Sequence, residues 1–290
     1  MGPPGALLVA GPGVLGGGVG ARWRGAGGRV VAQTATDGAH GALAAAGFEP
    51  RTAAEGAAAG GERFPNVLFS APPSGAARAG FEDYPAAVEA AAALWDGSGT
   101  LLFTGSASVY DADGEVSVSE RSATKSADDE KAGRLLRAEE AVLSRGGCVV
   151  RLVGLYHSQR GAHMFFLKKE EVPRWGGYSI NLLHYEDASE LCFQILQSGA
   201  SGGCAAFRGE IFLGCDGTPI TLQEMMDATL ASGAYEGRCS LTGAPGGGQP
   251  LGKLNVDCSW TREQTGWAPK HGSYAEFMAA GALDSFSAAV

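Results

Sequence analysis

A glycine-rich turn directly after an apolar run constrains the fold of this chain more than any other feature. Residues 6–11 read ALLVAG, and the sequence continues PGVLGG. A short apolar run is typical of a buried strand, and Gly11, Gly13 and Gly16 have the spacing G-x-G-x-x-G. In this spacing Gly11 allows a tight turn, Gly13 lets a pyrophosphate approach the backbone, and Gly16 lets a helix pack closely on the strand. The turn therefore predicts a dinucleotide phosphate site.

The helix expected after the turn supplies the second part of such a site. It would begin at Val14 and Leu15, where free N–H groups and the positive end of the helix dipole favour an anion. The chain has 46 glycines, so a biased composition is the alternative explanation. We favour a phosphate loop, because the strand before it and the helix after it agree with that interpretation.

The first half of the chain alternates short apolar runs with helical segments. Strands are expected at 6–11, 29–34, 66–71, 100–105 and 148–156, with helices at about 14–25, 38–46, 82–95 and 128–144. This alternation is typical of βαβ units. It predicts an α/β Rossmann fold with a doubly wound parallel sheet, in which residues 1–156 form the NAD(P)-binding domain.

The second half is less regular. Residues 157–178 read as loop, followed by an extended piece at 180–183, a helix at 186–197, a strand at 210–215, a helix from about Thr221, a loop at 243–252 and a helix at 274–283. We expect residues 157–290 to form a smaller, interleaved C-terminal lobe on the substrate side that returns in part to the Rossmann domain.

Charge and cysteine content exclude several partners. Lys and Arg number 22 against 31 Asp and Glu, so the net charge is −9, which argues against nucleic acid. No stretch has the ~18 to 20 apolar residues of a membrane span. We expect a soluble intracellular protein of the cytoplasm or of an organelle matrix or stroma, as a homo-oligomer or an assembly subunit. The six cysteines are scattered and form no metal motif, so we expect reduced, mostly structural thiols and no metal; they are Cys148, Cys192, Cys204, Cys215, Cys239 and Cys258.

The end of the second strand bears on the choice of cofactor. NAD sites usually carry an acid there for the ribose hydroxyls, but this chain has Thr34. Without the acid, a 2′-phosphate is not repelled, and Arg22 or Arg24 could reach one. We therefore expect NADP to be preferred over NAD, although these arginines could equally be solvated at the helix end.

Several motifs follow one another in a recognisable order. They are the loop GPGVLGG, the stretch TLLFTGSASVYDADG with Ser119 and Glu120 after it, the strand RLVGLY, the segment INLLHYEDAS and the late stretch TREQTGWAP. This order resembles the extended and atypical short-chain dehydrogenase/reductases of the NAD-dependent epimerase/dehydratase type, over nearly the whole chain. The resemblance implies an NAD(P)-dependent oxidoreductase or epimerase that acts on a small polar metabolite such as a nucleotide sugar.

The resemblance also implies roles for single residues. Ser106, in SASVY, would hold a substrate oxygen beside the nicotinamide, and Tyr110 would be a structural or substrate-side tyrosine. Ala71 and Pro72 would line the adenosine and pyrophosphate side, and His184 would frame the site. The alternatives are a serine that caps a turn, a rigid Pro-Pro turn and a structural histidine.

The family's usual proton carrier has no counterpart. That carrier is the tyrosine of a Y-x-x-x-K motif, and this chain has no such motif. Alignment on Glu139 and Glu140 puts Lys131 or Ala132 at the tyrosine position and Leu135 or Leu136 at the lysine position.

Two hypotheses follow from this loss. Another group could carry the proton, with Tyr110, Tyr156 and His184 as candidates. Alternatively, the chain is a non-catalytic structural or regulatory subunit that binds the cofactor without turnover. A displaced helix does not restore the motif, because no tyrosine lies between Tyr110 and Tyr156.

Overall fold

A seven-stranded sheet forms the centre of the molecule. The computed structural model describes residues 4–58, 61–76, 79–111, 117–198, 207–244, 252, 255–283 and 286. The strands run in the order β11-β6-β5-β4-β1-β2-β3, and all neighbouring pairs are parallel. Their bounds are β1 (Leu7–Ala10), β2 (Val30–Thr34), β3 (Glu49–Thr52), β4 (Asn66–Phe69), β5 (Leu101–Ser106), β6 (Cys148–Leu152) and β11 (Ile211–Gly214). The strand β1 therefore lies inside the sheet, where the strand order reverses.

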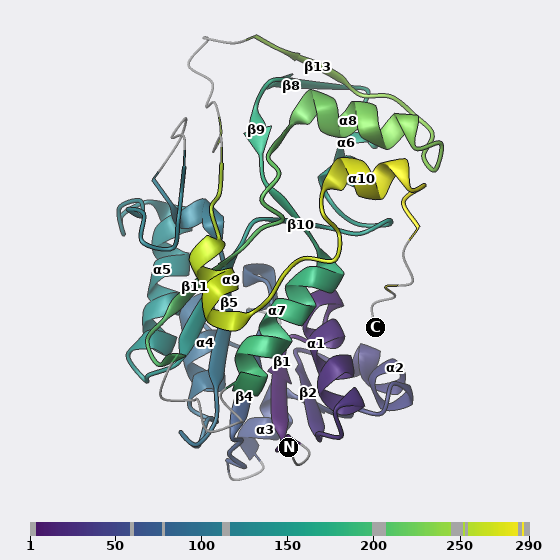
Figure 1. Ribbon diagram of the computed structural model, residues 1–290. Helices are drawn as coiled ribbons and strands as arrows, with labels where there is room; N and C mark the ends of the chain where they lie inside the picture. The colour runs from purple at the N-terminus through teal and green to yellow at the C-terminus, as the bar shows by residue number, and fades with distance from the viewer. Residues whose placement is uncertain are drawn as a thin grey trace.

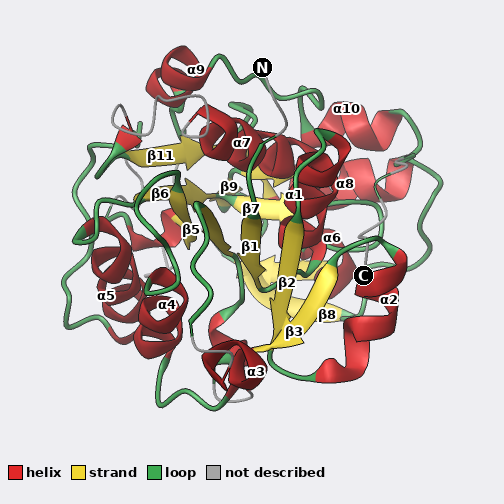
Figure 2. Cartoon of the chain, turned by 90° about the horizontal axis from the view of Figure 1, so that it is seen from below, coloured by secondary structure: helices red, strands yellow, loops and turns green. Residues whose placement is uncertain are grey.

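Helices cover both faces of the sheet (Figure 2). The helices α1 (Val14–Gly25) and α7 (Tyr185–Ser198) pack on one face, and α4 (Tyr84–Ala92) and α5 (Glu130–Leu143) on the other. Side chains of a strand alternate between faces, so Leu7 and Val9 join the core under α1, whereas Leu8 joins the core under α4. The predicted α/β Rossmann fold with a doubly wound parallel sheet is confirmed.

A smaller lobe lies above the carboxyl edge of the sheet (Figure 1). Within it β7 pairs with β10, β9 with β12 and β8 with β13, and Tyr156, Met225, Tyr274 and Phe277 belong to a third core. The elements after β6 are β7 (Gly154–Tyr156), α6 (Ala162–Phe166), β8 (Glu171–Trp175), β9 (Ser179–Ile180), β10 (Leu182–His184), β12 (Ile220–Thr221), α8 (Leu222–Ala231), β13 (Ser240–Gly243), α9 (Ser259–Thr265) and α10 (Tyr274–Ala279), besides α7 and β11. In the Rossmann part of the chain, two short helices, α2 (His40–Ala45) and α3 (Ala53–Ala58), flank β3.

The structure differs from the sequence-based expectation in several segments. The strand β3 reads EPRT and has no apolar pattern, so pattern analysis missed it. The expected strand 148–156 is divided, because Val153 leaves the sheet and β7 pairs with β10 instead. Residues 157–178, expected as loop, contain α6 and β8. Most of the expected loop 243–252 and Cys204 lie outside the described residues. Among the described residues, no helix combines the length and apolarity needed to cross a bilayer.

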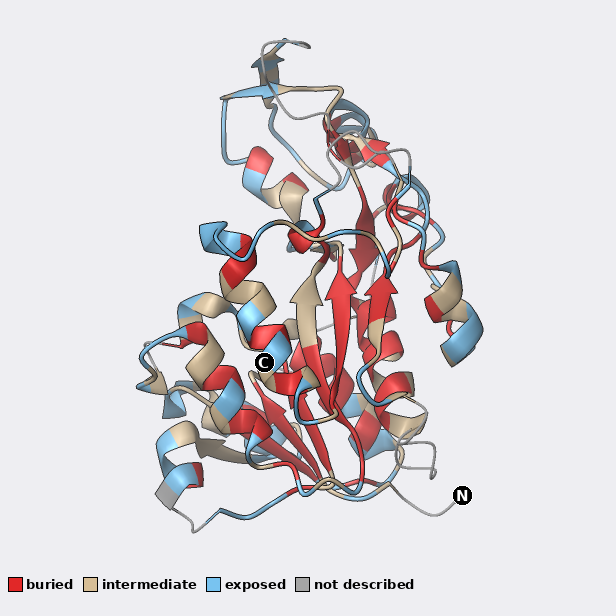
Figure 3. Ribbon diagram, turned by 90° about the vertical axis from the view of Figure 1, so that its left-hand side faces the viewer, coloured by how far each residue is buried: buried red, intermediate tan, exposed pale blue. Residues whose placement is uncertain are grey.

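The buried residues are concentrated in the sheet and the helix faces against it (Figure 3). One charged pair lies among them. The guanidinium of Arg151 on β6 donates to the carboxylate of Glu139 on α5 at 3.1 and 2.7 Å, and both side chains are at most 5% exposed. The same guanidinium lies 4.8 Å above the ring centre of Tyr110. The buried charge of Arg151 is therefore compensated by that of Glu139, and the reverse.

We expect Glu139→Ala to lower the free energy of unfolding by about 3–5 kcal/mol, because Arg151 would keep a buried charge without its partner. Urea denaturation measures the change. Glu140→Ala is the matched control, since Glu140 is exposed on the same helix turn and its loss should change stability by less than about 0.5 kcal/mol. Equal effects of the two substitutions would contradict the assigned role of the pair.

Candidate active site

The turn between β1 and α1 has the geometry of a phosphate loop. Gly11 has a φ of 91°, and a Cβ there would collide with the backbone nitrogen of Ala71. A Cβ on Gly16 would collide with the Gly11 carbonyl and the Ser70 hydroxyl, whereas one on Gly13 would meet nothing within 4 Å. Gly13 therefore borders open space, and the other two glycines permit close backbone packing.

A cavity of about 360 Å³, here called the first cavity, begins at this loop. It continues along residues 33–36 at the end of β2 and residues 69–72 at the end of β4. The helix α1 starts after Gly13 without a side-chain cap, so the N–H groups of Val14 and Leu15 begin the helix next to the cavity. The lining residues are uncharged; they include Gly11, Pro12, Gly13, Thr34, Ala71, Pro72, Phe81 and Tyr84.

The cavity lining at the end of β2 includes a neutral polar residue, Thr34. The Thr34 hydroxyl donates to the Arg51 carbonyl at 3.2 Å and lies 2.8 Å from His40 Nε2. Arg22 lies at the far end of α1, where it forms an ion pair with Glu190 of α7 at 2.9 Å, and Arg24 packs against Gly47. The interpretation that these two arginines bind a 2′-phosphate is therefore wrong, because α1 carries them away from the cavity.

A larger cavity of about 530 Å³, here called the second cavity, lies beside Ser106 at the end of β5. The Ser106 hydroxyl donates to the Ser108 hydroxyl at 2.9 Å and accepts the Ser108 N–H at 3.2 Å, so it both caps a turn and lines the cavity. The lobe supplies the opposite wall; its lining residues include Phe165, Arg174, Tyr178, Asn181 and Leu222. Sequence patterns gave no signal for Arg174 or Tyr178, which lie in a segment expected to be loop.

The two cavities lie at the same edge of the sheet. Gly13 follows β1 and Ser106 is the last residue of β5, and only β4 separates these strands. Two strand spacings amount to about 10 Å. Ligands of open α/β sheets bind at this carboxyl edge, next to the point where strand order reverses.

The tyrosines and the histidine expected to carry a proton are buried away from both linings. The Tyr110 hydroxyl donates to the Glu120 carbonyl at 3.3 Å, and burial raises the pKa of Tyr110. Tyr156 packs its ring 5.2 Å from that of His184, and burial likewise raises the pKa of Tyr156. Of the three residues for which we predicted catalytic roles, Ser106, Tyr110 and His184, Ser106 alone lines one of these two cavities.

The positions that the sequence resemblance aligned with Y-x-x-x-K lie on α5. Lys131 is exposed in its first turn, whereas Ala132 is buried. Leu135 and Leu136 are half-buried. Alignment therefore places neither a phenol nor an amine at the two positions of the motif.

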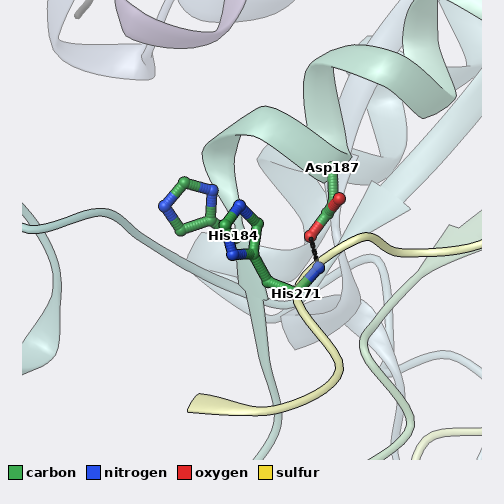
Figure 4. A group of neighbouring side chains, drawn as sticks. All are labelled: His184, Asp187 and His271. Carbon is green, nitrogen blue, oxygen red and sulfur yellow. Dashed lines mark hydrogen bonds between the residues drawn. The ribbon is translucent and has the colours of Figure 1, made fainter. Parts of the chain in front are cut away.

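His184, Asp187 and His271 form a compact group whose ligand atoms lie within 4.8 Å of one another (Figure 4). Their hydrogen bonds explain the arrangement without a metal. Asp187 accepts the N–H groups of Lys270 and His271 at 2.7 and 3.1 Å. His184 Nδ1 accepts the Glu186 N–H at 3.1 Å, which leaves the proton of a neutral ring on Nε2. The group therefore fastens the loop before α10 to the start of α7.

Asp216, which follows β11, is a buried carboxyl behind the second cavity. It is 5% exposed, and its Oδ1 accepts the Thr218 N–H at 2.8 Å. Its Oδ2 has no hydrogen-bond partner among the described residues. Burial raises the pKa of Asp216 to about 7, so ionisation at neutral pH opposes folding.

Comparison with known proteins supports the fold. No family model and no curated protein sequence matches the chain. The fold is a Rossmann fold, and solved structures share it over almost the whole chain. UDP-glucose 4-epimerase from Stenotrophomonas maltophila, with bound NAD and formylated UDP-arabinopyranose, is 15% identical, with a TM-score of 0.72 over 95% of this chain and 96% of that one.

Two further structures have the same fold. The UDP-Glc/GlcNAc 4-epimerase of Campylobacter jejuni is 14% identical, with a TM-score of 0.74 over 96% of this chain and 98% of that one. A conserved protein of unknown function from Silicibacter pomeroyi is 17% identical, with a TM-score of 0.69 over 96% and 98%. The chain therefore has the fold of nucleotide-sugar epimerases, which confirms the fold that the sequence resemblance implied.

The raised pKa of Asp216 predicts a pH-dependent stability. The folded pKa, about 7, exceeds the ordinary 3.8, so the folded state binds the proton more tightly and the free energy of unfolding falls as pH rises between these values. We expect the free energy of unfolding to fall by an amount on the order of 2–4 kcal/mol between pH 5 and pH 8. Urea denaturation at these two pH values measures the change.

Asp216→Asn should remove this slope, because the amide keeps an acceptor for Thr218 and carries no charge. Asp227→Asn, at an exposed position on α8, is the control and should keep the slope. If the slope persisted in the Asp216 variant, the buried carboxyl would not be its source.

Proposed function

We propose that this chain binds NAD or NADP in the first cavity and a small polar metabolite, of the nucleotide-sugar class, in the second. The observation that supports this most is the turn at Gly11, Gly13 and Gly16, which borders open space and starts a helix at the reversal point of the sheet. Backbone N–H groups of Val14 and Leu15 would bind the pyrophosphate.

Other residues extend the cofactor site in this proposal. Ala71 and Pro72 would contact the pyrophosphate and adenosine, and the apolar wall with Phe81 and Tyr84 would hold the adenine ring. Thr34 would bind the ribose. Its neutral hydroxyl neither repels a 2′-phosphate nor forms an ion pair with it. The site therefore offers little discrimination between NAD and NADP.

The second cavity suits a polar ligand with a charged group. Its volume of about 530 Å³ lies within the usual range for small-molecule sites, ~300 to 1,000 Å³. The Arg174 guanidinium would bind a diphosphate through paired hydrogen bonds, and Phe165 supplies an apolar surface. The solved epimerases with this fold include one with bound NAD and a UDP-sugar derivative, which supports the proposed substrate class.

The proposed activity is that of an oxidoreductase or epimerase. A bound nicotinamide would accept or return a hydride. Ser106 and Ser108 would hold the reacting oxygen by their hydroxyls. Tyr110 and His184 are buried behind the cavity walls, so we assign the proton to Tyr178, a phenol in the second cavity's lining with Arg174 in the same wall.

The rival proposal is a cofactor-binding subunit without turnover. The missing Y-x-x-x-K motif and the buried positions of Tyr110, Tyr156 and His184 favour it. It shares the first cavity with the leading proposal but does not require Tyr178 to move a proton, so separate measurements of binding and turnover distinguish the two.

We expect NAD or NADP, at about 100 times its dissociation constant, to raise the melting temperature by roughly 5 °C. Gly13→Val should abolish the rise, because the side chain fills the space that the pyrophosphate needs, while the fold tolerates it. Gly25→Val is the matched control at the other, exposed end of α1 and should keep the rise. If neither dinucleotide shifts the wild-type melting temperature, both proposals fail.

Turnover with UDP-sugars tests the catalytic proposal. We expect Tyr178→Phe to lower kcat by roughly 100-fold or more, the usual effect of losing a general acid or base, without changing the cofactor-dependent melting shift. Tyr185→Phe removes a phenol from the buried start of α7 and should leave kcat unchanged. Cofactor binding with no turnover of any UDP-sugar would favour the non-catalytic subunit.

A further inference from the structure

Two cysteines far apart in the sequence meet behind the wall of the second cavity. Cys215 directly follows β11, and Cys258 precedes α9. Their sulfur atoms lie 3.1 Å apart, and the two residues are 0% and 2% exposed. Cys215 Sγ also lies 3.0 Å from the carbonyl oxygen of Val256, a residue that lines the second cavity.

Hydrogen bonds of neighbouring groups fix the positions of the two sulfur atoms. The Leu213 N–H donates to the Thr261 hydroxyl at 2.9 Å, which joins β11 to α9. The Arg262 guanidinium donates to the carbonyl groups of Cys215 and Asp216 at 3.3 and 2.9 Å. A disulfide needs the sulfur atoms to approach by only about 1 Å, so the surrounding backbone keeps the pair ready to react.

The electrostatic surroundings make the two thiols unequal. The hydrogen bond from the Cys215 thiol and the charge of Arg262 lower the pKa of Cys258 to about 7, against the effect of burial. The same hydrogen bond and burial raise the pKa of Cys215. A thiolate next to a thiol is the arrangement from which disulfides form.

We propose that Cys215 and Cys258 form a redox-active pair that closes to an intramolecular disulfide when a peroxide reaches it. The Cys258 thiolate attacks hydrogen peroxide, gives a sulfenic acid and releases hydroxide. The sulfur of Cys215 then attacks the sulfenic sulfur, a water molecule leaves, and the S–S bond forms. Two thiols and one peroxide give one disulfide and two waters. The bond would join the sheet to the segment that carries Val256.

The proposal goes beyond the expectation of reduced, mostly structural thiols. Cys192 on α7 is as buried as the pair, but burial raises its pKa to about 12, whereas the pKa of Cys258 is lowered. The pair does not depend on the proposed cofactor or substrate, so it can be tested without them.

The test treats the full chain with hydrogen peroxide, alkylates the denatured protein with iodoacetamide and analyses its peptides by mass spectrometry. We expect the wild type and Cys192→Ala to lose two alkylatable thiols, and a linked peptide pair to contain Cys215 and Cys258. Cys215→Ser should give no such pair and leave Cys258 as an over-oxidised acid. Dithiothreitol should restore both thiols in the wild type.

A second measurement uses the wild type alone, so it does not depend on how well the cysteine variants fold. The cross-link restricts the unfolded chain, so peroxide should raise the melting temperature of the wild type and dithiothreitol should reverse the rise. Both thiols remaining alkylatable after treatment, or a linked pair that joins other cysteines, would overturn the proposal. So would equal oxidation of Cys258 in the wild type and in Cys215→Ser without a cross-link.

Discussion

Close backbone packing at the end of β1 is the constraint on which the candidate site depends. The Ser70 N–H donates to the Ala10 carbonyl at 2.8 Å, and the Ser70 hydroxyl donates to the Gly11 carbonyl at 2.7 Å. The start of α1 is packed against this contact, since any side chain on Gly16 would collide with both groups. The ends of β1 and β4 and the start of α1 are thereby fixed together in the middle of the sheet, and the first cavity forms beside them.

Two acids at the start of α7 then fix the lobe above the sheet. Asp187 accepts two backbone N–H groups of the loop before α10, and Glu186 contacts the side chains of Lys270 and His271. Because α7 packs on the sheet with α1, this loop connects the lobe to the Rossmann core. The lobe can then present Arg174 and Tyr178 to the second cavity, opposite Ser106.

The helix α5 has a structural role in this chain. Glu139 of α5 pairs with Arg151, whose guanidinium covers the ring of Tyr110. A phenol held in this way, with its hydroxyl on a backbone carbonyl, exchanges protons poorly with a ligand in the cavity. We therefore proposed a proton carrier from the lobe, Tyr178, which lines the second cavity.

Local patterns in the sequence determined the Rossmann core. The apolar runs at 6–11, 66–71 and 100–105 identified strands, and the glycine spacing identified the turn between β1 and α1, because side-chain period and backbone freedom are local properties. The polar strand β3 and the short helices α6 and α9 carried no such pattern. Only the tertiary structure could decide which distant residues come together, because no local window of the sequence encodes contacts between distant segments. It pairs Arg22 with Glu190 and buries Tyr110 and His184. It also places Arg174 and Tyr178 in a cavity lining and brings Cys215 to Cys258.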